Sequence, residues 1–495
     1  MNEELCWRAV QAQDRRFDCW FVLGVVTTGI YCRPGCPART PLRRNVRFHP
    51  SAAAAQAAGL RACKRCRPDA SPGSPAWDGR SDLVARATRL IADGVVDRGG
   101  VPDLARRLGY NRRQVERALR AELGAGPRAL ARAQRAQTAR ILLETTRLGI
   151  ADVAFAAGFG SVRQFNHTIH EVFASRPGEL RARGRRGSPS APGTVQLRLP
   201  FRAPLWPDSL FGHLVATAVP GVEEWRDGAY RRTLRLPFGV GIVALRPPAG
   251  KDSRPGHVAC RLSLTDLRDL APAVARCRRL LDLDADPIAV DERLAYVETL
   301  APLISKAPGR RVPRSVDAGE LALRAVLGQQ VSTAAARTHA GRLVLACGEP
   351  IDDPEGGLTH LFPTPAAVAG VDPAVLALPG TRRASLLRLA SALADGELDL
   401  EPGADWTRAR TQLHTLPGIG PWTVETIAMR GLGDPDAFLP GDLGVVLAAR
   451  TLGLGTGRPL LRRADRWAPY RAYAVQHLWA VGDHAVNTLP IGDRP

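Results

Sequence analysis

The sequence of 495 residues lacks any long apolar run. No stretch reaches the ~18 consecutive apolar residues that a membrane-spanning helix needs, so we expect no contact with a membrane. Residues 1–4 are partly acidic and no apolar stretch follows them, which predicts that no secretory leader is present. Both absences favour a cytoplasmic protein. In a reducing compartment, nine cysteines indicate metal ligands or reactive thiols rather than disulfides.

Lysine is nearly absent as well, because Lys64, Lys251 and Lys306 are the only lysines among 68 basic residues. Acidic residues number 48, which leaves a net charge of +20. Of the 20 excess positive charges, 17 lie within residues 1–187. This distribution predicts a polyanionic partner, most simply nucleic acid, that is bound mainly by the N-terminal part. It argues against a metabolic enzyme that acts on neutral substrates.

The pattern of residues changes several times along the chain, and its length allows three or four domains of about 150 residues. We expect a multidomain α+β protein with a small zinc-bound α/β domain, an all-α double helix-turn-helix domain, an α+β subdomain and an all-α domain. Short β-like runs around a cysteine cluster give way to helices of period 3.6, then to alternating strands, and then to helices again. The predicted boundaries are 1–80, 81–183, 194–300 and 301–495, with a Gly/Ser/Pro/Arg linker at 184–193.

Four cysteines gather within 35 residues, as a Cys-x3-Cys pair and a Cys-x2-Cys pair that are 26 residues apart. They are Cys32, Cys36, Cys63 and Cys66. Four thiolates on two short loops are typical of a tetrahedral zinc site. The spacing alone favours a structural zinc ion and leaves a reactive zinc thiolate as the alternative. Cys6 and Cys19 fall outside the pattern, and we expect them to be buried thiols.

The sequence around these cysteines resembles the N-terminal domain of the adaptive-response regulator Ada over residues 3–72, through TTGIYCRPGCPAR at 27–39 and RACKRC at 61–66. The resemblance implies that one Zn²⁺ is bound by all four cysteines. It also implies that Cys32 irreversibly accepts a methyl group from a methylated DNA phosphate. The positions that it places near DNA are Thr28, Pro37, Arg39 and Arg61, although the family often has a basic residue at the position of Pro37.

Such a methyl transfer would change the charge that faces DNA. A zinc ion with four thiolates carries a formal charge of −2, and methylation of one sulfur reduces it to −1. Because the loss of a negative charge favours binding to phosphates, the damage becomes a signal for tighter DNA binding.

Two segments further along the chain each predict a helix, a glycine turn and a second helix. The first runs over 101–119 with its turn at Gly109, and the second runs over 150–169 with its turn at Gly158. A helical bundle with solvated arginines is the alternative. The second copy resembles the C-terminal signature of AraC-type regulators, and the resemblance covers residues 82–183. It implies that RNA polymerase is a partner if the protein is an activator. We expect the recognition helices to present Arg112, Arg113, Ser161, Arg163 and Gln164 to base edges.

The segment LPGIGPWT at 416–423 predicts a helix-hairpin-helix. Glycine allows close approach of the backbone, so amides near Gly418 and Gly420 can bind a DNA phosphate without reading sequence. Asp442 follows Gly420 by 22 residues and precedes a predicted helix at Leu443. By position alone, Asp442 is the N-cap of that helix.

The hairpin, this spacing and the FLPGDL context at 438–443 together resemble the alkylation-repair glycosylase AlkA of the helix-hairpin-helix superfamily over residues 195–485. The resemblance implies hydrolytic excision of alkylated purines of the 3-methyladenine type, with Asp442 as the catalytic carboxylate. It implies that Trp422 and Trp479 line the base pocket, that Gln330 is the wedge, and that Thr426 stands where relatives place a tyrosine.

Three further absences limit the chemistry. Lyase-type members of the superfamily carry a lysine where this chain has Trp422, and no lysine follows Lys306, so we expect a monofunctional glycosylase. No cysteine follows Cys347, which excludes the iron–sulfur cluster of some relatives. Nothing resembles the Pro-Cys-His-Arg site of alkylguanine transferases.

The sequence therefore predicts a fusion of a methyl acceptor, a regulator and a glycosylase. Its partner is expected to be double-stranded DNA, at damaged sites and at a promoter, with a location in the nucleoid. The alternative is a transcriptional regulator whose glycosylase half only binds DNA.

Overall fold

The computed structural model describes residues 2–18, 20–68, 82–183, 193–248 and 256–490. The predicted linker, apart from Gly193, and Cys19 lie outside the described residues. By its internal contacts the chain divides into two compact units. The first is Met1–Phe201 with Leu236–Val240 and Arg261–Ala275, and the second is Arg202–Arg235, Gly241–Cys260 and Arg276–Pro495. Among the described helices, none has the length and apolar character needed to cross a bilayer.

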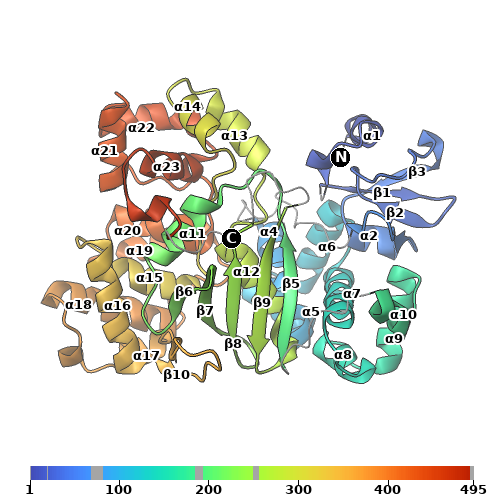
Figure 1. The fold of residues 1–495 in the computed structure, drawn as a ribbon, viewed down its shortest axis with the longest axis horizontal. Helices are drawn as coiled ribbons and strands as arrows, with labels where there is room; N and C mark the ends of the chain where they lie inside the picture. Colours follow the sequence, from blue (N-terminus) through green and yellow to red (C-terminus); the bar gives the residue numbers. More distant parts are fainter. Residues whose placement is uncertain (1, 19, 69–81, 184–192, 249–255, 491–495) are drawn as a thin grey trace. The chain divides into compact units, whose positions relative to one another are not determined.

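The cysteine-rich segment forms a small α/β fold around a four-stranded sheet of order β3-β1-β2-β4 (Figure 1). Strand β1 pairs antiparallel with β2 and β3, whereas β2 pairs parallel with β4. Cys6 is buried in the core of this fold, as predicted. The elements are α1 (Glu3–Gln11), η1 (Arg15–Phe17), β1 (Val22–Val25), β2 (Ile30–Cys32), η2 (Arg43–Asn45), β3 (Val46–His49), α2 (Ala52–Ala57) and β4 (Arg61–Ala62).

The next segment is entirely helical and contains both predicted helix-turn-helix units. Gly109 and Gly158 adopt φ of +76° and +84°, the left-handed conformation that glycine reaches at little cost, and each ends the first helix of its pair. The helices are α4 (Leu83–Ala92), α5 (Val95–Leu108), α6 (Arg112–Leu123), α7 (Pro127–Thr145), α8 (Ile150–Ala156), α9 (Val162–Phe173) and α10 (Pro177–Arg183).

A five-stranded sheet of order β5-β9-β8-β7-β6 follows, as the alternating pattern predicted. Strand β5 alternates between buried and exposed side chains along its length, which gives the sheet one face toward a core. The elements are β5 (Thr194–Pro200), α11 (Pro207–Ala216), β6 (Glu223–Arg226), β7 (Ala229–Arg235), β8 (Val240–Arg246), β9 (His257–Leu264), η4 (Leu267–Asp269) and α12 (Leu270–Leu280).

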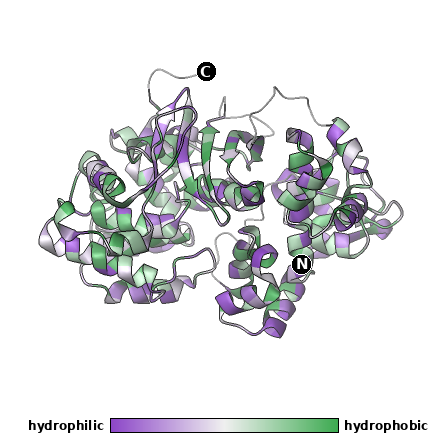
Figure 2. Cartoon of the chain, turned by 90° about the horizontal axis from the view of Figure 1, so that it is seen from below, coloured by the Kyte–Doolittle hydropathy of each residue, from purple (hydrophilic) through white to green (hydrophobic). Residues whose placement is uncertain are grey.

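The remaining described residues are mostly helical, and hydrophobic and hydrophilic residues alternate along these helices (Figure 2). The larger elements are α13 (Pro287–Ala295), α14 (Ala301–Lys306), α15 (Ala318–Leu327), α16 (Thr333–Cys347), α17 (Pro365–Ala369), α18 (Gly380–Ala394), α19 (Trp406–Thr415), α20 (Pro421–Thr426), the π-helix η6 (Ile427–Leu432), α21 (Leu443–Thr451), α22 (Arg458–Ala464) and α23 (Arg471–Trp479). The shorter ones are β10 (Glu349–Pro350), β11 (His360–Leu361), η5 (Pro373–Val375), η7 (Asp465–Trp467) and η8 (Ala485–Asn487).

Helices α20 and η6 run along two hydrophobic cores. Val424 and Ile427 belong to a core with α15, α16, α18 and α19, whereas Ala428 and Met429 belong to a second core with α13, α21 and α23. The predicted hairpin is therefore fixed against both cores. The multidomain α+β fold class agrees with the prediction.

A buried ion network joins the sheet to α15. The carboxylate of Glu223 accepts hydrogen bonds from Arg232 at 2.9 Å and from Arg324 at 3.0 Å. Glu320 accepts from the same two arginines, both at 2.8 Å. Burial alone would raise the pKa of Glu223, but Arg324 and Arg232 lower it to about 2. Because α15 leads directly to Gln330, the network also fixes the helix that carries the predicted wedge.

Replacing Glu320 with alanine should destabilise the second unit by about 3–5 kcal/mol, because the buried Arg232, 2% exposed, loses a partner. Urea denaturation followed by tryptophan fluorescence measures the change. Glu397→Ala is the matched control, since Glu397 pairs with Arg388 where both side chains are largely exposed, and little change is expected there. Equal effects of the two substitutions would contradict the importance of the buried network.

Candidate functional site: a thiol cluster and an aromatic carboxylate site

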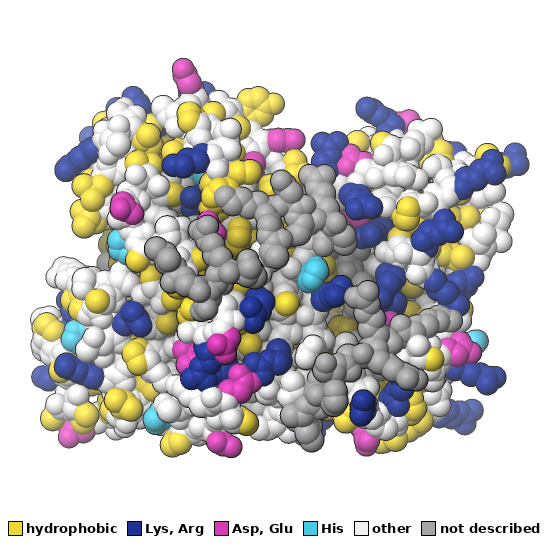
Figure 3. Space-filling model, viewed as in Figure 1, with side chains coloured by type: hydrophobic (Ala, Val, Ile, Leu, Met, Phe, Trp, Pro, Cys, Tyr) yellow, Lys and Arg dark blue, Asp and Glu magenta, His cyan; other side chains and the backbone are white. Residues whose placement is uncertain are grey.

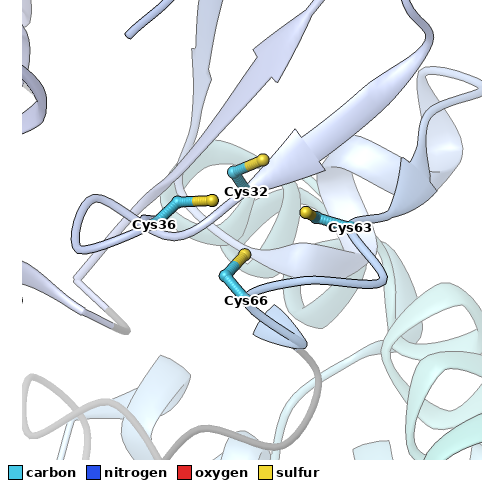
Figure 4. Close-up of side chains that lie close together, drawn as sticks. All are labelled: Cys32, Cys36, Cys63 and Cys66. Atoms are coloured by element: carbon cyan, nitrogen blue, oxygen red, sulfur yellow. The ribbon is translucent and has the colours of Figure 1, made fainter. Parts of the chain in front are cut away.

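The four predicted zinc ligands lie together. Cys32 ends β2, Cys36 lies in the loop after it, and Cys63 and Cys66 follow β4 (Figure 4). Since β2 and β4 are parallel neighbours, their ends bring the two cysteine pairs to one place. The four sulfur atoms all lie within 4.8 Å of one another, a separation that suits one tetrahedral ion.

Asp18 holds the loop between the first two ligands, which the sequence alone did not indicate. Its Oδ1 accepts a hydrogen bond from the backbone N–H of Gly35 at 2.8 Å, and its Oδ2 lies 3.3 Å from Nη1 of Arg33. A Cβ on Gly35 would lie 2.5 Å from Cγ of Arg15, so the loop is packed tightly where it turns.

The chemistry of the cluster fits zinc. Hydrogen bonds from Cys32 and then Cys66 lower the pKa of Cys36 to about 2, whereas the hydrogen bond to Cys36 raises the pKa of Cys32, with Cys66 and burial adding to it. One thiolate therefore forms readily, and its negative charge opposes the ionisation of the other three thiols. All four become thiolates only if a cation compensates that charge.

The residues predicted to approach DNA from this fold lie at its surface. Thr28 is exposed in the turn between β1 and β2, Pro37 and Arg39 are exposed after Cys36, and Arg61 is partly exposed on β4. Basic side chains are numerous on the visible face of the part that carries β1–β3 and α7–α10 in Figure 1, and acidic ones are fewer there (Figure 3). The DNA contacts of single residues stay predictions.

Both recognition helices begin with a capped turn. Asn111 and Gln114 form a capping box at the start of α6, and the hydroxyl of Ser161 accepts the N–H of Gln164 at the start of α9. Arg113 and Arg163 are exposed in the first turns. Arg112 donates to Glu116 at 2.9 Å, so DNA contact by Arg112 would compete with this ion pair.

Asp442 is the N-cap of α21, and its carboxylate is also the centre of an aromatic site. The N–H of Val445 donates to Oδ1 at 3.1 Å. The indole N–H of Trp479 donates to the same oxygen at 2.8 Å, and the indole N–H of Trp422 donates to Oδ2 at 2.9 Å. The predicted N-cap role of Asp442 is confirmed, and its catalytic role stays a prediction with which the two indole hydrogen bonds are compatible.

The sequence did not indicate that both tryptophans would donate to Asp442. Their N–H groups are occupied by the carboxylate, so a base that stacks on either indole has to use a ring face, and His213 stacks on one face of Trp479. Gly444 makes room for this arrangement, because a Cβ there would lie 2.9 Å from Cδ1 of Trp479. Thr426 is buried and its hydroxyl donates to the carbonyl of Trp422 at 2.7 Å, a bond within the helix.

The hairpin lies beside the predicted wedge. Gln330 is exposed and adopts φ of +55°, a left-handed conformation that is uncommon for a residue other than glycine. The preceding Gln329 donates through Nε2 to the carbonyl of Gly418 and to the hydroxyl of Thr423, both at 2.9 Å. Gln329, which the sequence analysis missed, therefore connects the turn at Gln330 to the hairpin.

Three family models match the chain. The metal binding domain of Ada matches residues 5–69, a helix-turn-helix domain matches 104–183, and the AlkA N-terminal domain matches 196–317. The four cysteines lie inside the first of these matches, which confirms the predicted zinc site. The helix-turn-helix prediction is confirmed by the second.

Curated relatives cover the whole chain or parts of it. The chain is 60% identical over 491 residues, 98% of both sequences, to a probable bifunctional transcriptional activator/DNA repair enzyme AlkA of Mycobacterium tuberculosis. It is 35% identical to DNA-3-methyladenine glycosylase 2 of Escherichia coli over 54% of this chain and 92% of that one. It is 33% identical to the bifunctional transcriptional activator/DNA repair enzyme Ada of E. coli over 34% of this chain and 47% of that one.

The two hairpin glycines should respond differently to alanine. At Gly418, φ is +78° and a Cβ would lie 1.9 Å from Oγ of Ser385, so Gly418→Ala should lower the free energy of unfolding by about 1–3 kcal/mol. At Gly420 no atom lies within 4 Å of the added Cβ, so Gly420→Ala should melt like wild type yet bind duplex DNA more weakly. Thermal melting and fluorescence anisotropy test this pair. Wild-type affinity of Gly420→Ala would mean that the hairpin backbone does not approach DNA closely there.

Proposed function

The chain belongs to the family of AlkA-type bifunctional transcriptional activator/DNA repair enzymes, and we propose that its C-terminal part excises alkylated purines from DNA. The observation that supports this most directly is the Asp442 carboxylate, held by two indole N–H groups beside a helix-hairpin-helix. A helix cap needs only the bond to Val445. The two tryptophan donors are additional, and they suit a carboxylate that has to keep its position and charge next to a reacting sugar.

In the proposed reaction the damaged nucleotide is flipped out of the duplex, and Gln330 fills the space it leaves. The alkylated purine is cationic and is therefore a good leaving group. It stacks on the electron-rich faces of Trp422 and Trp479 through cation–π attraction. As the bond from the base to C1′ breaks, positive charge develops on the sugar and the Asp442 carboxylate stabilises it.

Water then completes the reaction. Asp442 is the base that can orient a water molecule toward C1′, and its fixed oxygens define the direction of attack. We propose a monofunctional glycosylase, because no lysine follows Lys306 and Trp422 occupies the position where lyases carry their nucleophile. The product is an abasic site. The bond between Thr426 and the Trp422 carbonyl supports a pocket wall that differs from those formed by a tyrosine.

Replacing Asp442 with asparagine should reduce excision by at least about 10³-fold, because the amide oxygen can still accept hydrogen bonds but the charge is lost. Trp422→Phe keeps the ring face and removes one donor, and about a 10-fold loss is expected. Duplexes that each contain a single 3-methyladenine, hypoxanthine or other alkylated base measure both activity and lesion preference.

If wild-type protein leaves no abasic site and Asp442→Asn binds and behaves identically, the C-terminal part only binds DNA and the enzyme proposal is wrong. Undamaged duplex serves as the control for binding, since neither substitution changes the hairpin glycines Gly418 and Gly420.

For the thiol cluster we propose that Cys32 accepts one methyl group from a DNA methylphosphotriester. The sulfur of Cys32 attacks the methyl carbon, the S–C bond forms, the C–O bond breaks and the phosphodiester leaves with the electron pair. Zinc, when bound by the four cysteines, keeps the attacking sulfur a thiolate at neutral pH. Asp18 and Arg33 hold the loop that starts at Cys32.

The methylated cluster would carry one negative charge fewer, and this loss would favour binding to the negatively charged DNA. The exposed Arg113 and Arg163 then belong to helix-turn-helix units that bind a promoter, with RNA polymerase as the partner of an activator. We place this activity with the DNA of the nucleoid. The excess of arginine in residues 1–187 supports a regulator that stays bound to DNA.

After incubation with methylated DNA, peptide mass spectrometry should show a gain of about 14 Da on the peptide that contains Cys32. Cys32→Ala, the matched control, should show no gain. The methylated protein should also bind its promoter more tightly, with a difference that shrinks as salt increases. A gain on Cys36, Cys63 or Cys66 would refute Cys32 as the acceptor.

A further inference from the structure

His213 on α11 lies against the aromatic site, although it precedes Asp442 by more than two hundred residues. Its imidazole is 7% exposed and stacks on the Trp479 indole, with ring centroids 6.0 Å apart and planes at 18°. Nε2 of His213 is buried and has no hydrogen-bond partner among the described residues. A buried imidazole without a partner at Nε2 is costly to fold, so its place beside Trp479 needs an explanation.

The position of α11 is set by the segment that follows Trp479. A Cβ on Gly212 would lie 2.5 Å from the carbonyl oxygen of Thr488, so this face of α11 is in close contact with the chain just after η8. From the same segment, Nδ2 of Asn487 donates to the carbonyl of Trp479 at 2.9 Å. The helix that carries His213 and the backbone of Trp479 are thus held by one short stretch of chain.

Trp479 is restrained on several sides. Its N–H is bound by Asp442, its carbonyl by Asn487, its edge lies against Gly444, and one face of its ring is covered by His213. Trp479 also packs against the second hydrophobic core, and the His213 stack is the ring contact that restrains the tilt of the indole plane. A tilt of the plane would move Nε1 away from Oδ1 of Asp442.

The imidazole is uncharged under ordinary conditions. Burial lowers the pKa of His213 well below its usual value, and the positive charges of Arg430 and Arg324 and the nearby His484 lower it further. An uncharged ring can stack on Trp479 without opposing a cationic purine nearby, whereas an imidazolium would repel it.

We propose that His213 is a positioning residue for base excision, which acts through Trp479 by fixing the indole plane in which Nε1 reaches Asp442. The inference rests on the proposed glycosylase function. It assigns to α11 an indirect part in a site whose carboxylate and two tryptophans all come from residues beyond 420.

The test combines His213→Ala, His213→Phe and Trp479→Ala, alone and paired. His213→Ala should slow single-turnover excision about 10- to 100-fold while the Kd for undamaged duplex stays unchanged, because the reacting geometry is lost and the DNA surface is not. His213→Phe provides a flat, neutral ring of similar size and should restore the rate to within a few-fold. In the Trp479→Ala background, His213→Ala should cause no further loss.

Two results would overturn the proposal. One is an equal loss from His213→Ala with and without Trp479, which would make the effect a general one on folding. The other is a slow His213→Phe, which would mean that the histidine acts through its own nitrogens. Thermal melting identifies a variant that fails to fold, and His213→Phe, which keeps a flat uncharged ring at this place, then decides the question.

Failure of the proposed function is distinguishable from failure of this inference. If wild type and Asp442→Asn excise equally, the function fails. Binding of duplex that contains a cationic pyrrolidine in place of the damaged sugar still tests His213, since this binding needs Asp442 in position but no turnover. His213→Ala should weaken it at least 10-fold relative to undamaged duplex, and unchanged binding contradicts the inference.

Discussion

The hydrogen bonds that converge on the Asp442 carboxylate are the constraint on which the catalytic half depends. A charged group that is half-buried beside aromatic rings is costly unless its oxygens are paired. Its three donors come from α20, α21 and α23, so these helices have to meet at one point. The two hydrophobic cores on either side of α20 and η6, and the ion network that fixes α15, hold the surrounding helices in that arrangement.

The thiol cluster also holds negative charge in a partly buried place, but a different interaction stabilises that charge. Asp442 is stabilised by neutral N–H donors, which leave it negative and ready to face a positive sugar. The four sulfurs are too close for neutral donors to suffice, and a metal cation compensates their charge instead. Each arrangement suits the proposed chemistry, in which Asp442 would stabilise a developing cation and Cys32 would lose negative charge on methylation. The proposed DNA binding of the C-terminal part does not depend on the arginine excess, because 17 of the 20 excess positive charges lie within residues 1–187.

Much of the fold could be predicted from local patterns, because helix periodicity, strand alternation and glycine turns are properties of neighbouring residues. Gly109 and Gly158 are examples, and both adopt the predicted turns. The zinc ligands were predictable from spacing, since two short loops limit how far apart paired cysteines can lie. The directions of Trp422 and Trp479 were not, because an indole can turn its N–H toward many partners. Asp18, Gln329 and His213 gave no signal, since each acts on a residue distant in sequence.

By itself, the sequence determined which chemical groups are available: four cysteines at zinc spacing, a hairpin with two glycines, an aspartate at the start of a helix, and no lysine beyond residue 306. These are short-range features, fixed by bond geometry and by the residues next to them. The tertiary structure alone decided that both indoles donate to Asp442, that Gln329 joins the wedge turn to the hairpin, and that His213 stacks on Trp479. Such contacts depend on how separate helices pack, and packing is set by the summed burial of many side chains rather than by any one motif.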